Sequence, residues 1–588
     1  MLVQLGCANL HYLCIRKRKT TYKDTKYMKT IGFKNFRRFE NLEPLQLSKV
    51  NFFVGGNNSG KSTVTKAMML LMDNLTFMRP KQNGLLFENM PSFRLDANRI
   101  HDLHVGTFAR ALRKPYPDVK EMCFEAGFER YKFILTVTGN LDSTSADADV
   151  RKFEIVNLSD NVHYTFDFEA NTFIAEFNTE VLNEYPLASE PEFWRKIRFG
   201  FNRHSRNKPT QSQEKRFLEM KIAQLKADLA AQTNPVEIAR INNWIKTYTG
   251  NLKKLKDSEK PVITKTKGMV YESPLIIDYG MPSSRLIVNL LDSQWMHYKE
   301  AREGVKQVAH SNNSEEQSEQ ANRTARQAEE EEFYNGLYIE EKAMLCMFAD
   351  DARQLRRSLS LPHIEYLSAH TASQKVLFSI EDKNDYMSQV IREFVAAKIT
   401  EGSEMSKFLY DWMYKHFEIA MGYDIQPIHG EAYTMDVICM NGEKMPLADL
   451  GMGAVQIIML LLRLATIIGS TDNIAIRNTT FIVEEPEQNI HPKLQSRLAD
   501  LFAYVSDKYG CQFIIETHSE YIIRRTQAMI ATGEVSFEDN PFKVYYFPEN
   551  GYPYDMEYQE NGTFAKTFGK GFYDQASSLS FQVLQAKL

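Results

Sequence analysis

The hydrophobic pattern of the chain changes period along its first half. A mostly apolar run, Val50 to Val54, is followed by helical spacing from Val64 to Leu75, which predicts a buried strand and then a helix. Further on, apolar and polar residues alternate in the stretches 131–137, 162–168 and 172–177, with a tight turn before the last. Alternation of this kind is typical of antiparallel strands. We therefore predict a parallel core sheet with an antiparallel companion.

Residues 203–260 have a different, helical and polar pattern. Apolar side chains recur three and four residues apart on both sides of a break at Asn234-Pro235. This spacing predicts an antiparallel coiled-coil hairpin, in which a helix of about 20 residues extends roughly 30 Å. The segment has 13 Lys and Arg against 6 Asp and Glu, an excess of seven positive charges. Two interpretations stay open: a solvated arm, or a surface for nucleic acid or an acidic partner.

The second half adds two more buried strands and an apolar helix. The strands, Thr479–Val483 and Gln512–Glu516, are each followed by polar residues. The helix predicted from Val455 to Gly469 is interrupted by Gln456 and Arg463. No apolar stretch reaches the roughly 18–20 residues that a membrane span needs, so we interpret this helix as part of a core.

Composition excludes several classes of protein. The 588 residues are 43% hydrophobic and 25% charged, which rules out a disordered, collagen-like or disulfide-stapled chain. The formal net charge of −4 rules out a uniformly basic nucleic-acid coat. The six cysteines form no CxxC pair, so neither a zinc ribbon nor a disulfide framework is indicated, and we expect a reducing cytoplasm. Residues 1–27 are interpreted as an N-terminal extension.

The segment after the first predicted strand has the composition of a phosphate-binding loop. It fits the pattern G-x-x-x-x-G-K-[ST] and reads Gly55, Gly56, Asn57, Asn58, Ser59, Gly60, Lys61, Ser62, Thr63. The glycines let the backbone wrap around an anion, and the following helix offers its N-terminus. We predict that Lys61 reaches the β- and γ-phosphates of ATP and that the Ser62 hydroxyl binds Mg²⁺.

The ends of the later strands carry the side chains that nucleotide hydrolysis needs. Glu484 and Glu485 follow the first of them, and we assign Glu484 to the metal and Glu485 to the attacking water. His518 follows the second strand and is predicted to sense the γ-phosphate. Carboxyl ends of parallel strands meet at one edge of a sheet, which would place these groups beside the phosphate loop.

A second glycine motif, Gly451-Met452-Gly453, stands before the long apolar helix. Glycines at a helix N-terminus offer another anion site, and we include Gly451 and Gly453 among the nucleotide-binding residues. One nucleotide can occupy both sites only if the fold brings them together. Otherwise this site serves the nucleotide of another subunit.

The order of these motifs resembles the ABC-type ATPases of the RecF, SMC and overcoming-lysogenization-defect group, which are AAA-family ATPases. The resemblance covers residues 28 to about 545 and rests on Ile31–Phe39, the phosphate loop, Gly451-Met452-Gly453, Glu484–Glu487, Asn489-Ile490-His491-Pro492 and Glu516–Ser519. It implies a head with two lobes and ATP sandwiched between two heads, hence a homodimer or higher homo-oligomer. It also implies work in DNA repair or phage defence, with possible DNA and a separate nuclease effector as partners.

Three departures from the family pattern qualify the resemblance. Ala448-Asp449 stands where relatives carry a serine before the signature glycines, and His370 stands where they often carry an arginine. No Asp-x-Asp pair follows His518, so we expect no Toprim nuclease domain in this chain. The predicted arm also lacks a CxxC zinc hook.

The predicted fold class is therefore α/β: an ABC-type P-loop NTPase head with a parallel core sheet, an antiparallel β-subdomain, a helical lobe and an inserted coiled-coil hairpin. The expected segments are the extension at 1–27, the N-terminal half at 28–202, the arm at 203–260, a helical, linking lobe at 261–442 and the C-terminal half at 443–588. The predicted function is an ATP-hydrolysing switch. A transporter's nucleotide-binding subunit and an ATP-binding scaffold with negligible turnover are the alternatives.

Overall fold

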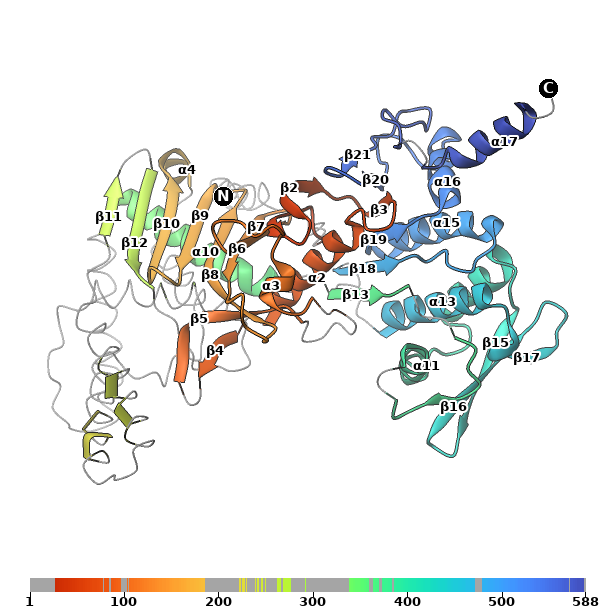
Figure 1. The fold of residues 1–588 in the computed structure, drawn as a ribbon, viewed down its shortest axis with the longest axis horizontal. Helices are drawn as coiled ribbons and strands as arrows, with labels where there is room; N and C mark the ends of the chain where they lie inside the picture. The colour runs from red at the N-terminus through yellow and green to blue at the C-terminus, as the bar shows by residue number, and fades with distance from the viewer. Residues whose placement is uncertain are drawn as a thin grey trace, which may run out of the picture. The chain divides into compact units, whose positions relative to one another are not determined.

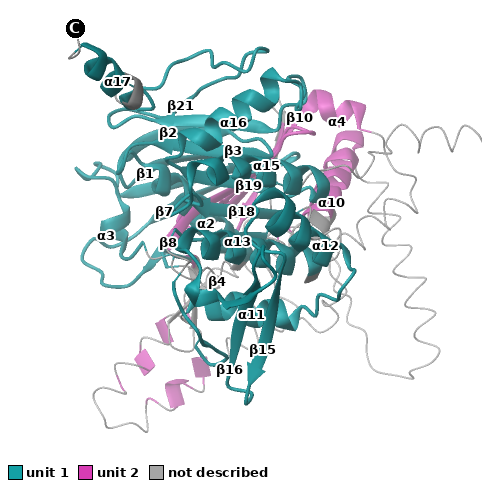
Figure 2. Ribbon diagram, turned by 90° about the vertical axis from the view of Figure 1, so that its right-hand side faces the viewer, with its two compact units in different colours: residues 1–76, 93–148, 360–588 teal, residues 77–92, 149–359 magenta. Residues whose placement is uncertain are grey.

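The computed structural model describes most of the chain (Figure 1). The described residues are 27–77, 79–83, 86–96, 103, 105–185, 262–265, 268–275, 338–358, 363–369, 373–382, 385–470, 478–569 and 572–585, with isolated positions between 222 and 294. Contacts divide the chain into unit 1, residues 1–76, 93–148 and 360–588, and unit 2, residues 77–92 and 149–359 (Figure 2). The predicted division into segments that begin at 28, 203, 261 and 443 stays a prediction.

A six-stranded sheet forms the centre of unit 1. Its order is β13 (His363–Leu367), β18 (Thr479–Glu484), β19 (Gln512–Thr517), β3 (Val50–Gly55), β20 (Phe542–Phe547) and β21 (Tyr554–Asp555). The first five strands are parallel and β21 is antiparallel to β20. Every residue of β3 and β19 is buried. Such continuous apolar strands are typical of a sheet covered on both faces, and the predicted parallel core sheet is confirmed.

Long helices follow or accompany these strands in unit 1: α2 (Lys61–Phe77), α13 (Met452–Ser470), α15 (Pro492–Tyr509) and α16 (Glu520–Ala531). Among the described residues, α13 is the one helix long and apolar enough to cross a membrane, over Met452–Gly469. Its apolar side chains are instead buried in the same core as those of β3, β18 and β19. The interpretation as a core helix is therefore confirmed.

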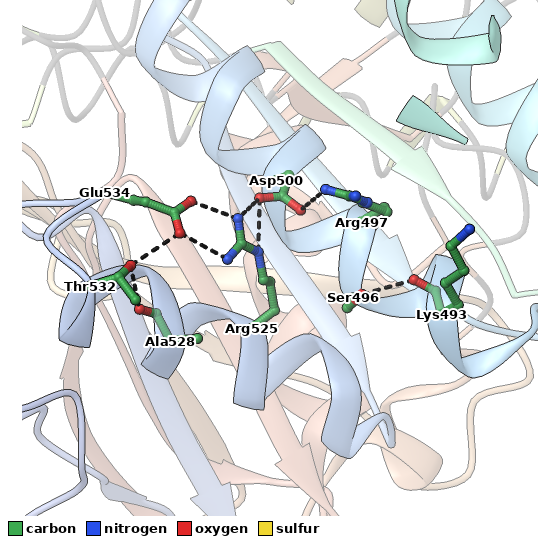
Figure 3. A network of polar contacts seen from close by, with 8 residues as sticks. All are labelled: Lys493, Ser496, Arg497, Asp500, Arg525, Ala528, Thr532 and Glu534. Carbon is green, nitrogen blue, oxygen red and sulfur yellow. Dashed lines mark hydrogen bonds and ion pairs between the residues drawn. The ribbon is translucent and has the colours of Figure 1, made fainter. Parts of the chain in front are cut away.

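An ionic network ties α16 to α15 (Figure 3). Nε and Nη2 of Arg525 both donate to Asp500 on α15, at 3.0 and 2.6 Å. The same guanidinium donates from Nη1 and Nη2 to Glu534, just after α16, at 3.1 and 2.7 Å. The Thr532 hydroxyl donates to Glu534 at 3.0 Å and to the carbonyl of Ala528 at 2.9 Å. A planar guanidinium that serves two carboxylates fixes the angle at which the two helices pack.

Unit 1 also contains antiparallel strands. One group pairs in the order β7 (Tyr131–Thr138), β6 (Glu121–Gly127), β1 (Thr30–Phe36) and β2 (Phe39–Gln46). A separate small sheet consists of β14 (Phe378–Ser379), β16 (Ala432–Ile438), β15 (Gly422–Ile428) and β17 (Lys444–Pro446). The remaining described elements of this unit are short or lie near the C-terminus: α3 (Phe108–Ala111), α11 (Tyr386–Ala396), α12 (Glu404–Tyr410), a π-helix (Asp411–His416), a 3₁₀ turn (Leu447–Asp449) and α17 (Gln575–Gln585).

Unit 2 is built around an antiparallel set of strands with the order β8 (Asp147–Asn157), β9 (Val162–Asp167), β10 (Thr172–Asn178), β12 (Gly268–Pro274) and β11 (Val262–Lys265). A hairpin of β4 (Arg79–Asn83) and β5 (Leu86–Arg94) and the helices α4 (Thr179–Glu184) and α10 (Ile339–Ser358) complete it. Tyr164 and Phe173 stack with Phe348 of α10 in its core. The predicted antiparallel strands are confirmed at β7, β9 and β10, and the predicted linking lobe, 261–442, contains strands as well as helices.

Three predicted features lie largely or wholly outside the described residues. Of the arm, 203–260, only isolated positions are described, all of them helical, and Ile222 and Ile241 among them are buried. The hairpin as a whole stays a prediction. The extension before residue 27 and His370 are also outside the description.

Candidate nucleotide-binding site

The loop between β3 and α2 has a backbone that only glycine permits at two positions. Gly55 has φ +154° and Gly60 φ +104°. A Cβ on Gly55 would lie 2.3 Å from the carbonyl oxygen of Phe547, and one on Gly60 would lie 2.7 Å from the ring of Phe39. No side chain fits at those separations. The glycine spacing of the motif is therefore explained by the local geometry.

Lys61 begins α2 and folds back over the loop. Its Nζ donates to the carbonyl oxygens of Gly55 at 2.9 Å and Gly56 at 2.8 Å, and lies 3.3 Å from Nε2 of His518. Burial lowers the pKa of Lys61, although the charges of three nearby glutamates oppose the shift. A buried ammonium that is held only by neutral carbonyls within the loop is well placed for a phosphate.

Other groups of the loop fit the same ligand. The Ser59 hydroxyl is buried and has no hydrogen-bond partner among the described residues. Asn57 and Asn58 are exposed at the tip. Arg38, from the turn between β1 and β2, donates to the carbonyls of Asn58 and Glu549, each at 2.7 Å. The orphaned hydroxyl, the buried ammonium and the glycine cradle together fit a nucleotide phosphate.

The hydroxyl of Ser62 is bonded to a carboxylate from the next strand of the sheet. Ser62 Oγ donates to Oε2 of Glu516 at 2.7 Å, and Thr65 Oγ1 donates to the other oxygen, Oε1. Glu516 is 3% exposed and pairs in register with Glu484 on β18. Burial, and then the charge of Glu484, raise the pKa of Glu516 to about 7. The next residue of α2, Thr63, is buried and its N–H bonds the carbonyl of Gly60.

Glu485 follows β18 in a left-handed backbone conformation, with φ +43°. Its N–H donates to the carbonyl of Glu516 at 2.8 Å, which anchors the turn to β19. Its carboxylate accepts from Nε2 of Gln488 at 2.6 Å and lies 3.7 Å from Nε2 of His518. A positive φ on a non-glycine residue is strained, and such strain is concentrated at functional sites.

Glu487 lies deeper, behind the histidine. The backbone N–H of His518 donates to Oε1 of Glu487 at 2.6 Å. The carboxyl is 9% exposed, and burial raises its pKa. Glu487 thus holds the loop that carries His518, which makes it a positioning group for that loop.

His518 connects the lysine to the glutamate. Burial, followed by the charge of Lys61, lowers the pKa of His518, while Glu485 opposes the shift. A lowered pKa keeps the imidazole neutral at pH 7, and a neutral imidazole can both donate and accept a hydrogen bond. Ser519, the N-cap of α16, donates to Gln495 at 2.6 Å and thereby fixes the end of this segment to α15.

The two glycines of the second motif have different surroundings. Gly451, just before α13, is exposed and has no heavy atom within 4 Å of an added Cβ. A Cβ on Gly453 would lie 2.3 Å from the carbonyl oxygen of Asn489, in the segment after Glu487. Gly453 therefore permits close packing of two backbones. No hydrogen bond among the described residues joins either glycine to the phosphate loop.

The structure brings together Lys61, Ser62, Glu485 and His518, which the sequence singled out. Glu484 lies at the same sheet edge, in register with Glu516. Sequence reasoning assigned no separate role to Glu516 or to Glu487. The signal for Glu516 was present: it is the one carboxylate in an otherwise uncharged buried strand, two residues before His518.

Comparison with family models identifies the chain. The model described as "AAA ATPase domain" matches residues 27–523. The chain belongs to this family. The match agrees with the predicted resemblance and supports a P-loop ATPase head with the α/β sheet described above. No curated protein matches the sequence.

Solved structures with a related arrangement are heads of SMC proteins. The Smc head domain with an extended coiled coil bound to the C-terminal domain of ScpA, from Pyrococcus furiosus, has 10% identity and a TM-score of 0.28, over 95% of this chain and 99% of that chain. The SMC head domain from Thermotoga maritima has 8% identity and a TM-score of 0.29, over 90% of this chain and 99% of that chain.

Proposed function

We propose that the protein is an ATP-hydrolysing molecular switch. The observation that carries this proposal is the juxtaposition of Lys61, His518 and Glu485, at 3.3 and 3.7 Å, at the mouth of the glycine loop. A cation for the phosphates, a neutral imidazole and a carboxylate for the attacking water are the groups that hydrolysis of the γ-phosphate needs.

The residues have separate tasks in this proposal. Residues 55–63 bind the phosphates through backbone N–H groups, and Lys61 neutralises part of their charge. Ser62 and Glu484 hold Mg²⁺, which neutralises charge that develops on the phosphate oxygens. Glu485 orients and deprotonates the water, and His518 reports the presence of the γ-phosphate to α16.

We further propose that ATP joins two heads into a homodimer. The N-terminus of α13 at Gly451 is exposed and can offer backbone N–H groups to the nucleotide of a second copy. A scaffold with negligible turnover is less well supported, because Glu485 and His518 are both in place. The burial of α13 accounts for its apolar sequence without a membrane, which favours a cytoplasmic protein. A transporter subunit needs a surface that docks membrane helices, and the coiled-coil insertion predicted at 203–260 disfavours that alternative.

The variant Glu485→Gln tests this function. It removes the base but keeps the shape and the bond to Gln488, so ATP should bind and persist. We expect turnover to fall by roughly 10²–10⁴, the usual contribution of a positioned base. Light scattering with ATP should then show a species of twice the mass. Undiminished phosphate release would exclude Glu485 as the base, and a monomer at saturating ATP would refute the dimer.

The arm is the reason to propose DNA as a partner and, with it, work in DNA maintenance or phage defence beside a separate effector. Its excess of seven positive charges suits phosphates. Reversing Lys253, Lys254 and Lys256 to Glu should weaken duplex binding equally across sequences and flatten its salt dependence, which has a slope near −0.9 per phosphate contacted. If the triple variant binds DNA as tightly as the parent at low salt, the arm is a spacer or a protein-docking element.

A further inference from the structure

Both oxygens of the Glu516 carboxylate accept hydrogen bonds from one turn of helix α2. It accepts from the Ser62 hydroxyl at 2.7 Å through Oε2 and from the Thr65 hydroxyl through Oε1. Ser62 and Thr65 are three residues apart and therefore lie on one face of the helix. With both oxygens engaged and 3% of the residue exposed, the carboxylate cannot rotate.

This bond determines what the Ser62 hydroxyl can offer to a ligand. A hydroxyl has one hydrogen and two lone pairs. Because the hydrogen is donated to Glu516, only lone pairs are left for a third group. A cation accepts lone pairs, whereas a phosphate oxygen needs a donor. The bond therefore suits Ser62 to bind a cation such as Mg²⁺ and leaves it no hydrogen to donate to the nucleotide.

The strand order explains why Glu516, and not Glu484, has this task. β19 lies between β18 and β3, so its end is nearer to the loop that follows β3. Glu484 and Glu516 are register partners on neighbouring parallel strands. The hydroxyls of Ser62 and Thr65 both donate to Glu516. The carboxylate that orients the serine thus belongs to the strand of His518.

We propose that Glu516 is a positioning residue for Mg²⁺: it holds Ser62 in the orientation in which its hydroxyl can bind the cation. The inference rests on the proposed ATP-binding function and adds a residue to it. Loss of an orienting partner of this kind costs about 10–100-fold in metal affinity. The effect should reach nucleotide binding only where the metal takes part.

The test compares nucleotide binding with and without the metal. Affinity for a fluorescent ATP analogue is measured in Mg²⁺ and in EDTA for the parent and for Glu516→Gln. We expect the gain in affinity from Mg²⁺ to fall about 10-fold or more in the variant, and the affinity in EDTA to change by less than about threefold. Electron paramagnetic resonance of Mn²⁺ with the analogue should show the same loss of metal binding directly.

A double-mutant cycle separates positioning from a merely structural role. Ser62→Ala removes the hydroxyl that Glu516 is proposed to orient, so Ser62→Ala with Glu516→Gln should be no worse than Ser62→Ala alone. Thr65→Val, which removes only the second donor to the carboxylate, should give a smaller loss. Asp500→Asn is the matched control: it alters another largely buried carboxylate of unit 1 and should change stability without changing the gain from Mg²⁺.

The outcomes are distinct. If the parent does not bind the nucleotide in either buffer, the proposed function itself fails. If the parent gains affinity from Mg²⁺ and Glu516→Gln gains as much, the positioning role is wrong while the ATP site stands. Equal losses in Mg²⁺ and EDTA, or additive effects with Ser62→Ala, would also overturn the positioning role.

Discussion

Two groups of carboxylates in unit 1 have opposite electrostatic surroundings. Asp500 and Glu534 share the guanidinium of Arg525, with contacts of 2.6 to 3.1 Å. The hydrogen bonds from Arg525 lower the pKa of Glu534. At the strand ends, burial raises the pKa values of Glu516 and Glu487. Two lysines, Lys61 and Lys66, interact with this second group, and burial lowers the pKa of both.

The opposite pKa shifts distinguish carboxylates whose charge stabilises the fold from carboxylates whose charge has a use only when a ligand is bound. Ionised groups with lowered pKa values contribute stability, whereas a carboxyl with a raised pKa is penalised when it ionises in the folded chain. Proteins retain such a penalty mainly where function needs the charge. A phosphate bound to Lys61 and a cation bound beside Glu516 would balance the charges of the second group, as Arg525 balances those of Asp500 and Glu534 in the first.

The largest effect is expected from Lys61→Ala. The variant removes the cation that is bonded to the carbonyls of Gly55 and Gly56, so the phosphates would lose the charge of the buried ammonium. We expect loss of ATP turnover and of measurable binding of a fluorescent ATP analogue. A melting curve close to that of the parent would show that the fold is intact. Equal affinity and equal turnover would refute the site.

Arg525→Ala should affect stability and leave the chemistry alone. It leaves Asp500, which is 16% exposed, with only the longer ion pair to Arg497 at 3.9 Å among the described residues, so we expect a loss of about 1–3 kcal/mol in the free energy of unfolding. Chemical denaturation measures the loss. Turnover per folded molecule should stay within about twofold. A loss of turnover larger than the loss of folded protein would show that the two carboxylate groups are coupled.

The smallest effect is expected from Glu534→Gln, and its sign depends on pH. The pKa of Glu534 is lowered from 4.5 in the folded chain. The stability that its charge contributes is therefore present above pH 4.5 and is lost as the pH falls through the lower, folded value. The parent should exceed the variant slightly in melting temperature at pH 7, and the difference should vanish in acid. A difference that grows below pH 4.5 would contradict the network.

Local patterns in the sequence predicted individual strands and helices well. They predicted less well which of these elements lie side by side. The glycine loop, the strands β7, β9 and β10, and the core helix α13 follow from spacing and hydrophobicity within short windows. The bond between Ser62 and Glu516 joins residues 454 positions apart and depends on β19 lying beside β3. No local rule contains that strand order. Glu516 was visible as a charge in a buried strand, but its partner was not.

The same reason explains why the packing contact of Gly453 was not predicted. A glycine at a helix start fits an anion site, and its sequence neighbours say nothing about a distant backbone. The structure places the carbonyl of Asn489 against it, too close for any Cβ. The anion-binding role of Gly451 and Gly453 stays a prediction, and for Gly453 a packing role is established beside it.

The contact between Gly453 and Asn489 has a mechanical consequence. Two backbones that meet without an intervening side chain have almost no slack, so a displacement of either one is passed on nearly undiminished. Asn489 follows Glu487, and Glu487 accepts from the N–H of His518. A displacement of the exposed start of α13 by a second molecule would therefore be transmitted through Asn489 and Glu487 to the loop that carries His518. Binding of a second molecule at α13 and hydrolysis at His518 would then be coupled because residue 453 is a glycine and has no side chain.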